Sequence, residues 1–434
     1  MTMHQPTTCF PCRYARFAAH LAATAMFLAG TAARAADPTI ATHARWVTAV
    51  AFTPDGATLV TTGGESLLYR PGDVVVWDVA TGKQKSKLAG HETCVGSLAI
   101  SPDGATLATG GIDGAIRLWD LASGQEKAKL DKHKLWVRSL AFSPDGARLA
   151  SGSEDGTVVI WDVAAANEDK TIKAHEGTVY CVAYSPDGAK LASAGGEKLV
   201  KFWNPADGAE TGKLEGHGDT VWRVAFTRDG SKIVTSSADR TVKVWDAAGK
   251  ELFTLAGHKD WVTSFAISPD GKTLITGSFD RTVRQWDLET APQSAPSVAA
   301  AIAAEQAARQ AAIAADGDAA TAAKTVETAK MALKDAGEDA AKKEAAQKML
   351  TEAEAAAKTA NDKKAEADKA AADAKAKLDE AQAALSTVLA TLKSTIWSVA
   401  LSPDGGTLAV GSHAESIRMW KQGAWQPIHA PATP

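Results

Sequence analysis

Histidine, serine or threonine, aspartate and tryptophan recur in the same order along most of this chain. In one example, His133 is followed by Ser151, Asp155 and Trp161. A histidine with a hydroxyl and a carboxylate is the composition of a hydrolase triad. A single active site occurs once, however, whereas this set returns in repeat after repeat, every 41 or 42 residues. We therefore interpret the set as part of a scaffold and expect no enzymatic activity.

The repeats predict the fold. There are seven repeats, and each ends on a tryptophan: Trp77, Trp119, Trp161, Trp203, Trp245, Trp286 and Trp420. In the third repeat, residues 137–143 alternate as a half-buried strand does, and Pro144-Asp145-Gly146 forms a tight turn before the returning strand. Two more strands complete the repeat. Seven four-stranded units are best closed into a ring, so we expect an all-β protein with seven antiparallel blades, a β-propeller.

A segment of different composition separates the sixth and seventh repeats. Residues 293–393 are rich in alanine, lysine, glutamate and aspartate, and most of these are strong helix formers. We predict an antiparallel α-helical, coiled-coil-like hairpin that turns near Gly337, with breakers at 316–318 and 335–339. Heptad spacing predicts a packing seam at Leu378, Leu385, Leu389 and Leu392. Two interpretations stay open: an arm for self-association or partner binding, and a spacer that binds nothing.

Residues 1–35 have the features of a secretory signal peptide. Two arginines precede a short apolar stretch at 17–30, and Ala33-Arg34-Ala35 is a cleavage signal. Fourteen apolar residues are too few for a membrane span of about 20. We expect a mature chain that begins at Ala36, without a membrane span, exported to a bacterial periplasm or the exterior. An uncleaved anchor and a cytosolic tail are the alternatives.

The other predicted boundaries follow from the repeats. Repeats one to six occupy 36–292, repeat seven occupies 394–425, and a tail occupies 426–434. Closing the ring requires an outer strand for the last blade from a distant segment. Thr39 to Ala41 and the tail after Trp420 are both candidates, and we favour the N-terminal one.

The repeats resemble the WD-repeat β-propeller family. The resemblance rests on Gly-His at 90–91, 216–217 and 257–258 and on Trp-Asp at five repeat ends, and it covers about two thirds of the chain. It implies hydrogen-bonded tetrads in four blades: His91, Thr109, Asp113, Trp119; His133, Ser151, Asp155, Trp161; His217, Thr235, Asp239, Trp245; and His258, Thr276, Asp280, Trp286.

Three repeats depart from this pattern. Repeat four has Glu197 at the aspartate position and ends in Trp203-Asn204. Repeat one has His43 but a longer second turn. Repeat seven has Val410 and Ala414 at tetrad positions and lacks the histidine, so we expect it to be the weakest blade.

The resemblance also indicates where a partner would bind. In WD-repeat proteins, the residues three and five positions after the histidine surround the mouth of the central channel. Here they include many aromatic residues, whose composition is that of an interface hot spot. The predicted partner-binding residues are Trp46, Trp136, Arg138, Tyr180, Trp222, Trp261, Phe279 and Trp397.

Together these observations predict a non-enzymatic scaffold for protein–protein interaction, whose partner the sequence does not name. A glycan- or small-ligand-binding module that uses the tryptophans, and a propeller enzyme with a channel-centred site, are the alternatives. Net charge is −4 without a basic block, so we do not expect nucleic acid as a partner. Six histidines belong to the repeated pattern, and we expect no metal and no cofactor.

Overall fold

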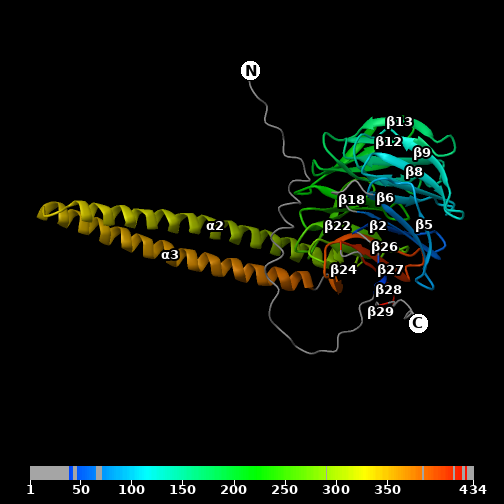
Figure 1. The fold of residues 1–434 in the computed structure, drawn as a ribbon. Coiled ribbons are helices and arrows are strands. Elements are labelled where there is room, and N and C mark those ends of the chain that lie inside the picture. Colours follow the sequence, from blue (N-terminus) through cyan, green and yellow to red (C-terminus); the bar gives the residue numbers. More distant parts are fainter. Residues whose placement is uncertain are drawn as a thin grey trace, which may run out of the picture. The chain divides into compact units, whose positions relative to one another are not determined.

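The computed structural model describes residues 39–42, 46–64, 71–289, 291–383, 386–413, 416–422 and 426–427. The predicted signal peptide, His43, Ala414 and most of the predicted tail lie outside these residues. The described residues form seven antiparallel sheets and a helical hairpin between repeats six and seven, which confirms the predicted fold class (Figure 1). Two compact units divide the chain, one of residues 1–174 with 397–434 and one of residues 175–396.

Blades one to three belong to the first unit, and in each the strands follow one another in sequence order. Blade one contains β2 (Trp46–Phe52), β3 (Thr58–Gly64), β4 (Asp73–Asp78) and β5 (Gln84–Leu88). Blade two contains β6 (Val95–Ile100), β7 (Thr106–Gly111), β8 (Ala115–Asp120) and β9 (Glu126–Asp131). Blade three contains β10 (Val137–Phe142), β11 (Arg148–Ser153), β12 (Thr157–Asp162) and β13 (Asn167–Lys173). Each second strand is almost wholly buried, whereas the fourth strands are largely exposed.

Blade seven draws on both ends of the chain. Its strands β26 (Ile396–Leu401), β27 (Thr407–Ser412) and β28 (Ser416–Lys421) are joined at the outer edge by β1 (Thr39–Thr42) and β29 (Gln426–Pro427). The N-terminal strand β1 pairs with β28 up to Arg418, and β29 pairs with Trp420 and Lys421. From the sequence, these two segments were alternative candidates for the outer strand of the last blade. Both are used, because the four-residue β1 is too short to cover the whole of β28.

The second unit contains blades four to six. Blade four contains β14 (Val179–Tyr184), β15 (Leu191–Gly195), β16 (Leu199–Trp203) and β17 (Glu210–Glu215). Blade five contains β18 (Val221–Phe226), β19 (Lys232–Ser237), β20 (Thr241–Asp246) and β21 (Glu251–Ala256). Blade six contains β22 (Val262–Ile267), β23 (Thr273–Ser278), β24 (Thr282–Asp287) and β25 (Ser386–Thr391).

The outer strand of blade six follows the helical insertion instead of preceding it. β25 pairs antiparallel with β24, from Trp286 opposite Ser386 to Thr282 opposite Thr391. The predicted leucine seam is therefore wrong at two of its positions: Leu389 lies in β25, and Leu392 is buried just after that strand. Leu385 lies outside the described residues. Strand pairing overrides the heptad spacing here, because β24 would otherwise present an unpaired edge.

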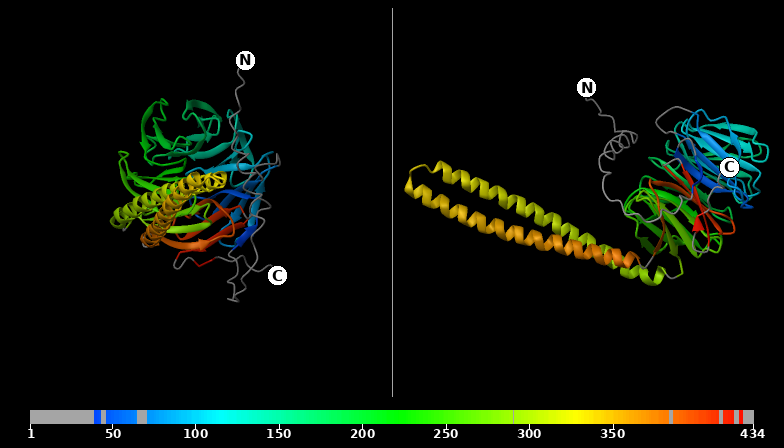
Figure 2. Two further views of the ribbon diagram at one scale, coloured as in Figure 1. Left: turned by 90° about the vertical axis from the view of Figure 1, so that its left-hand side faces the viewer. Right: turned by 60° about the horizontal axis from the view of Figure 1, so that its bottom comes forward.

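The insertion forms two long helices, α2 (Ala291–Asp335) and α3 (Ala340–Ala383), which run antiparallel side by side (Figures 1 and 2). Gly337 lies in the turn with φ 54°, a left-handed conformation that glycine adopts without strain. Asp339 caps α3 by accepting the backbone N–H groups of Ala341 and Lys342. The predicted breaker at 316–318 is wrong, since α2 runs through it and Asp316 pairs with Lys364 of α3 at 2.8 Å.

Alanine forms the contact between the helices. Buried and half-buried positions alternate at three- and four-residue spacings from Ala301 to Ala336 and from Ala346 to Ala381. Nearly all are alanine; the exceptions are Glu305, Val326, Leu333, Leu350, Lys364 and Leu378. Small side chains on both helices let the backbones approach closely, so this seam stabilises the arm by close packing more than by bulky apolar side chains.

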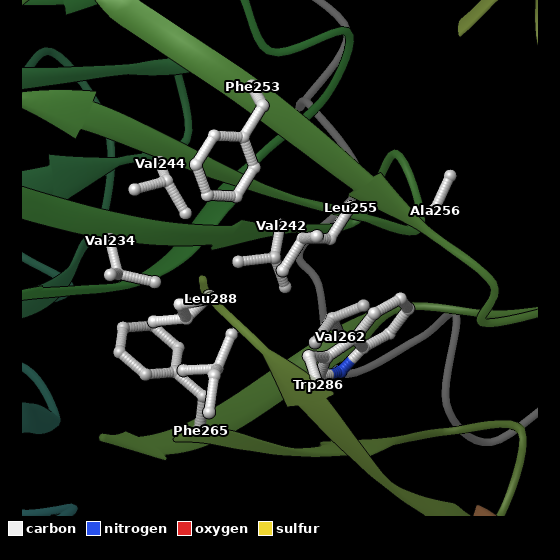
Figure 3. Packing of buried hydrophobic residues seen from close by; sticks show 11 residues of the cluster. Val234, Val242, Val244, Phe253, Leu255, Ala256, Val262, Phe265, Trp286 and Leu288 are labelled. Carbon is white, nitrogen blue, oxygen red and sulfur yellow. The ribbon is translucent and has the colours of Figure 1, made fainter. Parts of the chain in front are cut away.

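The blades are held together by apolar layers between neighbouring sheets. In the second unit, Phe265 and Trp286 of blade six are each 1% exposed and share a cluster with Val234 and Val242 of blade five (Figure 3). Leu288, just after β24, completes the layer. Fully burying one such side chain contributes roughly 1.5–3 kcal/mol. The loops at the ends of the strands therefore sit on a rigid support.

Candidate functional site

The third repeat shows how the recurring tetrad of histidine, serine, aspartate and tryptophan is arranged. In His133, Nδ1 lies 3.1 Å from Asp155 Oδ2, and Nε2 lies 2.7 Å from Ser151 Oγ. The carboxylate only accepts, so Nδ1–H donates to it and Nε2 accepts from the serine hydroxyl. The indole N–H of Trp161 donates to the same hydroxyl at 2.8 Å. The four side chains thus form one continuous chain of hydrogen bonds.

The second unit repeats this geometry in three blades. In blade four, Glu197 replaces the aspartate, and its carboxylate lies 2.8 Å from His175 Nδ1. The Nδ1–carboxylate distances are 2.8 Å for His217–Asp239 and 2.9 Å for His258–Asp280. In all three blades the central hydroxyl also accepts the indole N–H at 2.9 Å, in the pairs Trp203–Ser193, Trp245–Thr235 and Trp286–Thr276.

The electrostatics follow from burial and pairing. Burial by itself would raise the pKa of Asp239, but hydrogen bonds from His217, Thr241 and the Gly218 N–H outweigh it and lower the pKa to about 2. The same balance lowers the pKa of Asp280, with His258 as the main partner. Burial lowers the pKa of His258, so its imidazole is neutral and its partner carboxylate is ionised at neutral pH.

These sets cannot act as hydrolytic sites. The hydroxyl-bearing Ser151, Thr235 and Thr276 are 0% exposed, and each hydroxyl already accepts an indole N–H. No substrate carbonyl could reach them without unfolding the blade. Their chemistry is structural: a buried imidazole, a carboxylate and an indole satisfy one another.

Blade two departs from the pattern that its sequence predicts. His91 Nε2 pairs with Thr109 Oγ1 at 2.7 Å, but the buried Nδ1 has no hydrogen-bond partner. In blades three, five and six, a serine at the end of the second strand anchors the aspartate N–H. Blade two has Gly111 there, and Asp113 lies over this glycine, where a Cβ would be 2.4 Å from its Oδ1. The predicted link between His91 and Asp113 is therefore absent.

Blades one and seven lack a complete described set. In blade one, Trp77 donates to Thr61 at 2.8 Å, and His43 lies outside the described residues. In blade seven, Val410 is 0% exposed and occupies the hydroxyl position with an apolar side chain. The stability of blade seven relative to the others stays a prediction.

Of the predicted partner-binding residues, those of the first unit form two separate contacts. The Arg138 guanidinium lies 3.5 Å from the ring centroid of Trp136, and its Nε donates to Glu154 at 2.9 Å. Trp46 lies against His413, with ring centroids 4.0 Å apart. Trp397 is half-buried in β26. Leu135, next to Trp136, is 50% exposed and adds apolar surface beside the arginine.

The second unit brings four predicted residues into one row, which we call the aromatic row: Tyr180, Trp222, Trp261 and Phe279. Ring centroids are 4.6 Å apart for Tyr180–Trp222, 5.6 Å for Trp222–Trp261 and 5.2 Å for Trp261–Phe279. All four side chains are half-buried. The row crosses blades four, five and six, so three repeats contribute to one continuous aromatic surface.

Sequence reasoning missed two residues that contact the predicted partner-binding set. Glu154, Phe279 and His413 occupy the same place in different repeats, immediately after the second strand. Each contacts a predicted partner-binding residue: Glu154 contacts Arg138, Phe279 contacts Trp261, and His413 contacts Trp46. We named only Phe279 from the sequence. Reading the repeats column by column at this position would have found the other two.

The part of the chain that the structure describes holds no candidate metal site and no candidate membrane helix. There, no group of three or more histidine, cysteine, aspartate or glutamate residues is placed to hold a metal ion. Neither described helix combines the length and the apolar character that crossing a membrane requires.

Seven antiparallel sheets, six of four strands and one of five, with recurring buried tetrads define a repeat protein of the β-propeller class. The family model "WD domain, G-beta repeat" (WD40) matches seven segments, at residues 38–78, 82–120, 124–162, 167–204, 208–246, 249–287 and 386–421. These matches cover more than half of the chain, and the protein belongs to the WD40-repeat family. The seventh match begins at Ser386, so it includes β25, the outer strand of blade six, together with the strands β26, β27 and β28 of blade seven. A search of the curated proteins finds no match.

Proposed function

We propose that this protein is an exported, non-enzymatic scaffold that binds a protein segment on the aromatic row. Propellers of WD40 repeats commonly mediate protein–protein interaction. The single observation that carries the proposal is the continuity of Tyr180, Trp222, Trp261 and Phe279 across three blades. Tryptophan and tyrosine supply large contact area at little conformational cost, and such residues dominate binding energy at interfaces.

The geometry of the row favours a polypeptide over a glycan. A sugar ring would stack on an open aromatic face. Trp261, however, is stacked on Phe279 on one flank and lies beside Trp222 on the other. The rings of Trp222 and Tyr180 are tilted by 58° to each other. The row therefore presents edges and partial faces, which suit the irregular side chains of a polypeptide.

Export rests on the sequence of residues 1–35, which has the order of a signal peptide. Mass determination of the protein from a secretion-competent bacterial host tests this part. We expect a chain that begins at Ala36. Recovery of the full-length chain from the cytosol would contradict export and leave the binding proposal standing.

The binding proposal is tested by affinity purification from an envelope extract. The baits are the mature chain, the double variant Trp222→Ala/Trp261→Ala, and a variant whose helices at 291–383 are replaced by a short Gly/Ser linker. This last variant retains β25, which blade six requires. Leu252→Ala is the matched control, because Leu252 is 45% exposed on β21 of the same unit.

We expect one protein partner to be retained by the mature chain, the control and the linker variant. Its recovery should fall by about tenfold or more with the double tryptophan variant, as for a hot-spot loss. Thermal unfolding of each bait checks that the blades remain folded. A partner lost with the linker variant and retained by the tryptophan variant would place binding on the arm and refute the proposal.

A further inference from the structure

One turn position differs between the blades. The residue after the tetrad carboxylate is Gly114 in blade two and Gly156 in blade three, with φ of 84° and 82°. In blades four to six the same position holds Lys198, Arg240 and Arg281, with φ of 73°, 74° and 70°. A left-handed backbone is free of strain for glycine and strained for a residue with a side chain. These three cations therefore stand where folding alone would favour glycine.

The three cations are exposed, and none of the ion pairs or side-chain hydrogen bonds among the described residues involves them. Other basic residues of the same blades are engaged. Lys243 pairs with Glu251 at 2.8 Å, and Arg284 donates to Ser386 Oγ at 2.9 Å. A strained backbone at residues whose side chains make no hydrogen bond or ion pair within the protein indicates a role for these side chains outside the fold.

Each cation lies on a turn that is next to a segment carrying a ring of the aromatic row. Arg281 follows Phe279 by two residues, and the N–H of Phe279 donates to the Trp261 carbonyl at 3.0 Å. In blade five, the N–H of Ala238, two residues before Arg240, donates to the carbonyl of Thr220 at 2.9 Å, two residues before Trp222.

In blade four, the turn that carries Lys198 lies beside the ring of Tyr180, and the residue of the turn next to this ring is a glycine. A Cβ on Gly196, two residues before Lys198, would lie 3.7 Å from the Tyr180 ring. Every blade of the second unit thus places at least one ring and one unpaired cation on neighbouring segments.

We propose that the aromatic row and these three cations together bind an acidic, extended polypeptide segment, with apolar side chains on the rings and carboxylates on the cations. The inference rests on the proposed function and adds the charge of the partner. Arginine and lysine at the rim of an apolar contact select a partner of opposite charge.

The neighbouring acids separate this partner from a nucleic acid. Exposed Asp219 and Asp260 lie on the turns before Trp222 and Trp261, where they accept backbone N–H groups of Thr220 and Trp261. Glu176 stands at the corresponding turn of blade four. These carboxylates interrupt the positive charge and would repel a continuous phosphate backbone, whereas a peptide can space its carboxylates to match the cations.

The test uses the variant Lys198→Gly/Arg240→Gly/Arg281→Gly of the mature chain. Glycine removes the cations and relieves the left-handed strain, so the thermal midpoint should be unchanged or higher. The matched control, Lys324→Gln/Lys343→Gln/Lys348→Gln, removes the same charge from exposed positions of the arm. The probes are fluorescein-labelled octapeptides that alternate glutamate with leucine or lysine with leucine, and an oligo-dT strand, measured by fluorescence anisotropy at low salt.

We expect the glutamate peptide to bind at least about tenfold more tightly than the lysine peptide. The glycine variant should lose that preference, and the arm control should retain it. Equal binding of both peptides, no binding of either, or a preference that survives in the glycine variant would overturn the inference. Binding of oligo-dT that depends on the three cations, without peptide selectivity, would overturn it in favour of a nucleic acid.

Two other patterns of results distinguish the charge requirement from the proposed function. Peptide binding that falls with Trp222→Ala and is insensitive to the glycine substitutions would leave the aromatic row as the binding surface and remove only the charge requirement. Cation-dependent binding that survives Trp222→Ala and Trp261→Ala would contradict the proposed function itself.

Discussion

The indole of Trp136 in blade three lies directly over Gly96 in blade two, and a Cβ placed on Gly96 would be 1.9 Å from its Nε1. The glycine therefore makes room for the ring on which Arg138 stacks at 3.5 Å. Arg138 is also held by Glu154, so the absent side chain at Gly96 helps to position a charged residue of the next blade. The surface of the first unit depends on this close approach.

Gly96→Ala should displace the Trp136 indole and destabilise the protein by about 1–3 kcal/mol, as overpacking does. Urea denaturation measures the loss. In a Trp136→Ala background the same substitution should cost much less, because the two residues are coupled. Additive costs in the double variant would show that the contact between Gly96 and Trp136 carries no strain.

Gly111→Ser should complete the unfinished tetrad of blade two. The serine hydroxyl can anchor the Asp113 N–H as Ser153 anchors Asp155. Its Cβ would lie 2.4 Å from Asp113 Oδ1 and 3.2 Å from His91 Nδ1, so the carboxylate must leave its place over residue 111. We expect a gain of roughly 0.5–1.5 kcal/mol, the net value of one hydrogen bond, measured by urea denaturation. NMR titration should show a higher pKa for His91. An unchanged pKa with lower stability would mean that Asp113 cannot move.

Acid should destabilise the protein in two stages. Burial, aided by the positive charge of Arg117, lowers the pKa of His91 to about 4, below its ordinary value of 6.5. The unfolded chain therefore binds the extra proton first, and stability falls as the pH drops from about 6.5 to 4, by up to about 3 kcal/mol for this residue. Urea midpoints at pH 7, 5.5 and 4.5 measure the decline, which His91→Gln should reduce.

The second stage belongs to the tetrad carboxylates. The pKa of Asp239 is about 2 in the folded protein, below its ordinary value near 4, so its stabilisation is present above pH 4 and is lost as the pH falls toward 2. Asp239→Asn should lower stability at pH 7 and flatten the decline below pH 4. A variant whose urea midpoint still falls as steeply between pH 4 and 2 would show that Asp239 is not the group responsible.

The alanine seam of the arm should tolerate little added volume. Ala353 is 7% exposed between the helices, whereas Ala356 on the same helix faces solvent. Ala353→Leu should destabilise the arm by about 1–3 kcal/mol, and Ala356→Leu should leave it nearly unchanged. Limited proteolysis of the helices measures the local effect. Equal resistance of both variants would indicate that the helices are not closely packed at Ala353.

Much of the fold could be predicted because it depends on the spacing of residues that are close in the sequence. The recurrence of tryptophan every 41 or 42 residues, the Pro-Asp-Gly turns and the alternating strands each act within one repeat, so the sequence alone determined the seven blades. The change to helix-forming residues likewise determined the hairpin and its turn at Gly337. These features depend on neighbours that are close in the chain.

Tertiary structure decided what depends on distant partners. Leu389 has the spacing of a helix but pairs in β25, since the edge of β24 must be covered. Asp113 has the right position for a tetrad but lies over Gly111, because this glycine replaces the serine that anchors the aspartate two residues later in other blades. β1 and β29, which are far apart in the sequence, both pair with β28, and four rings from three blades form one row. The sequence by itself determined which residues each repeat offers, and only packing between strands far apart in the chain decided which of them meet.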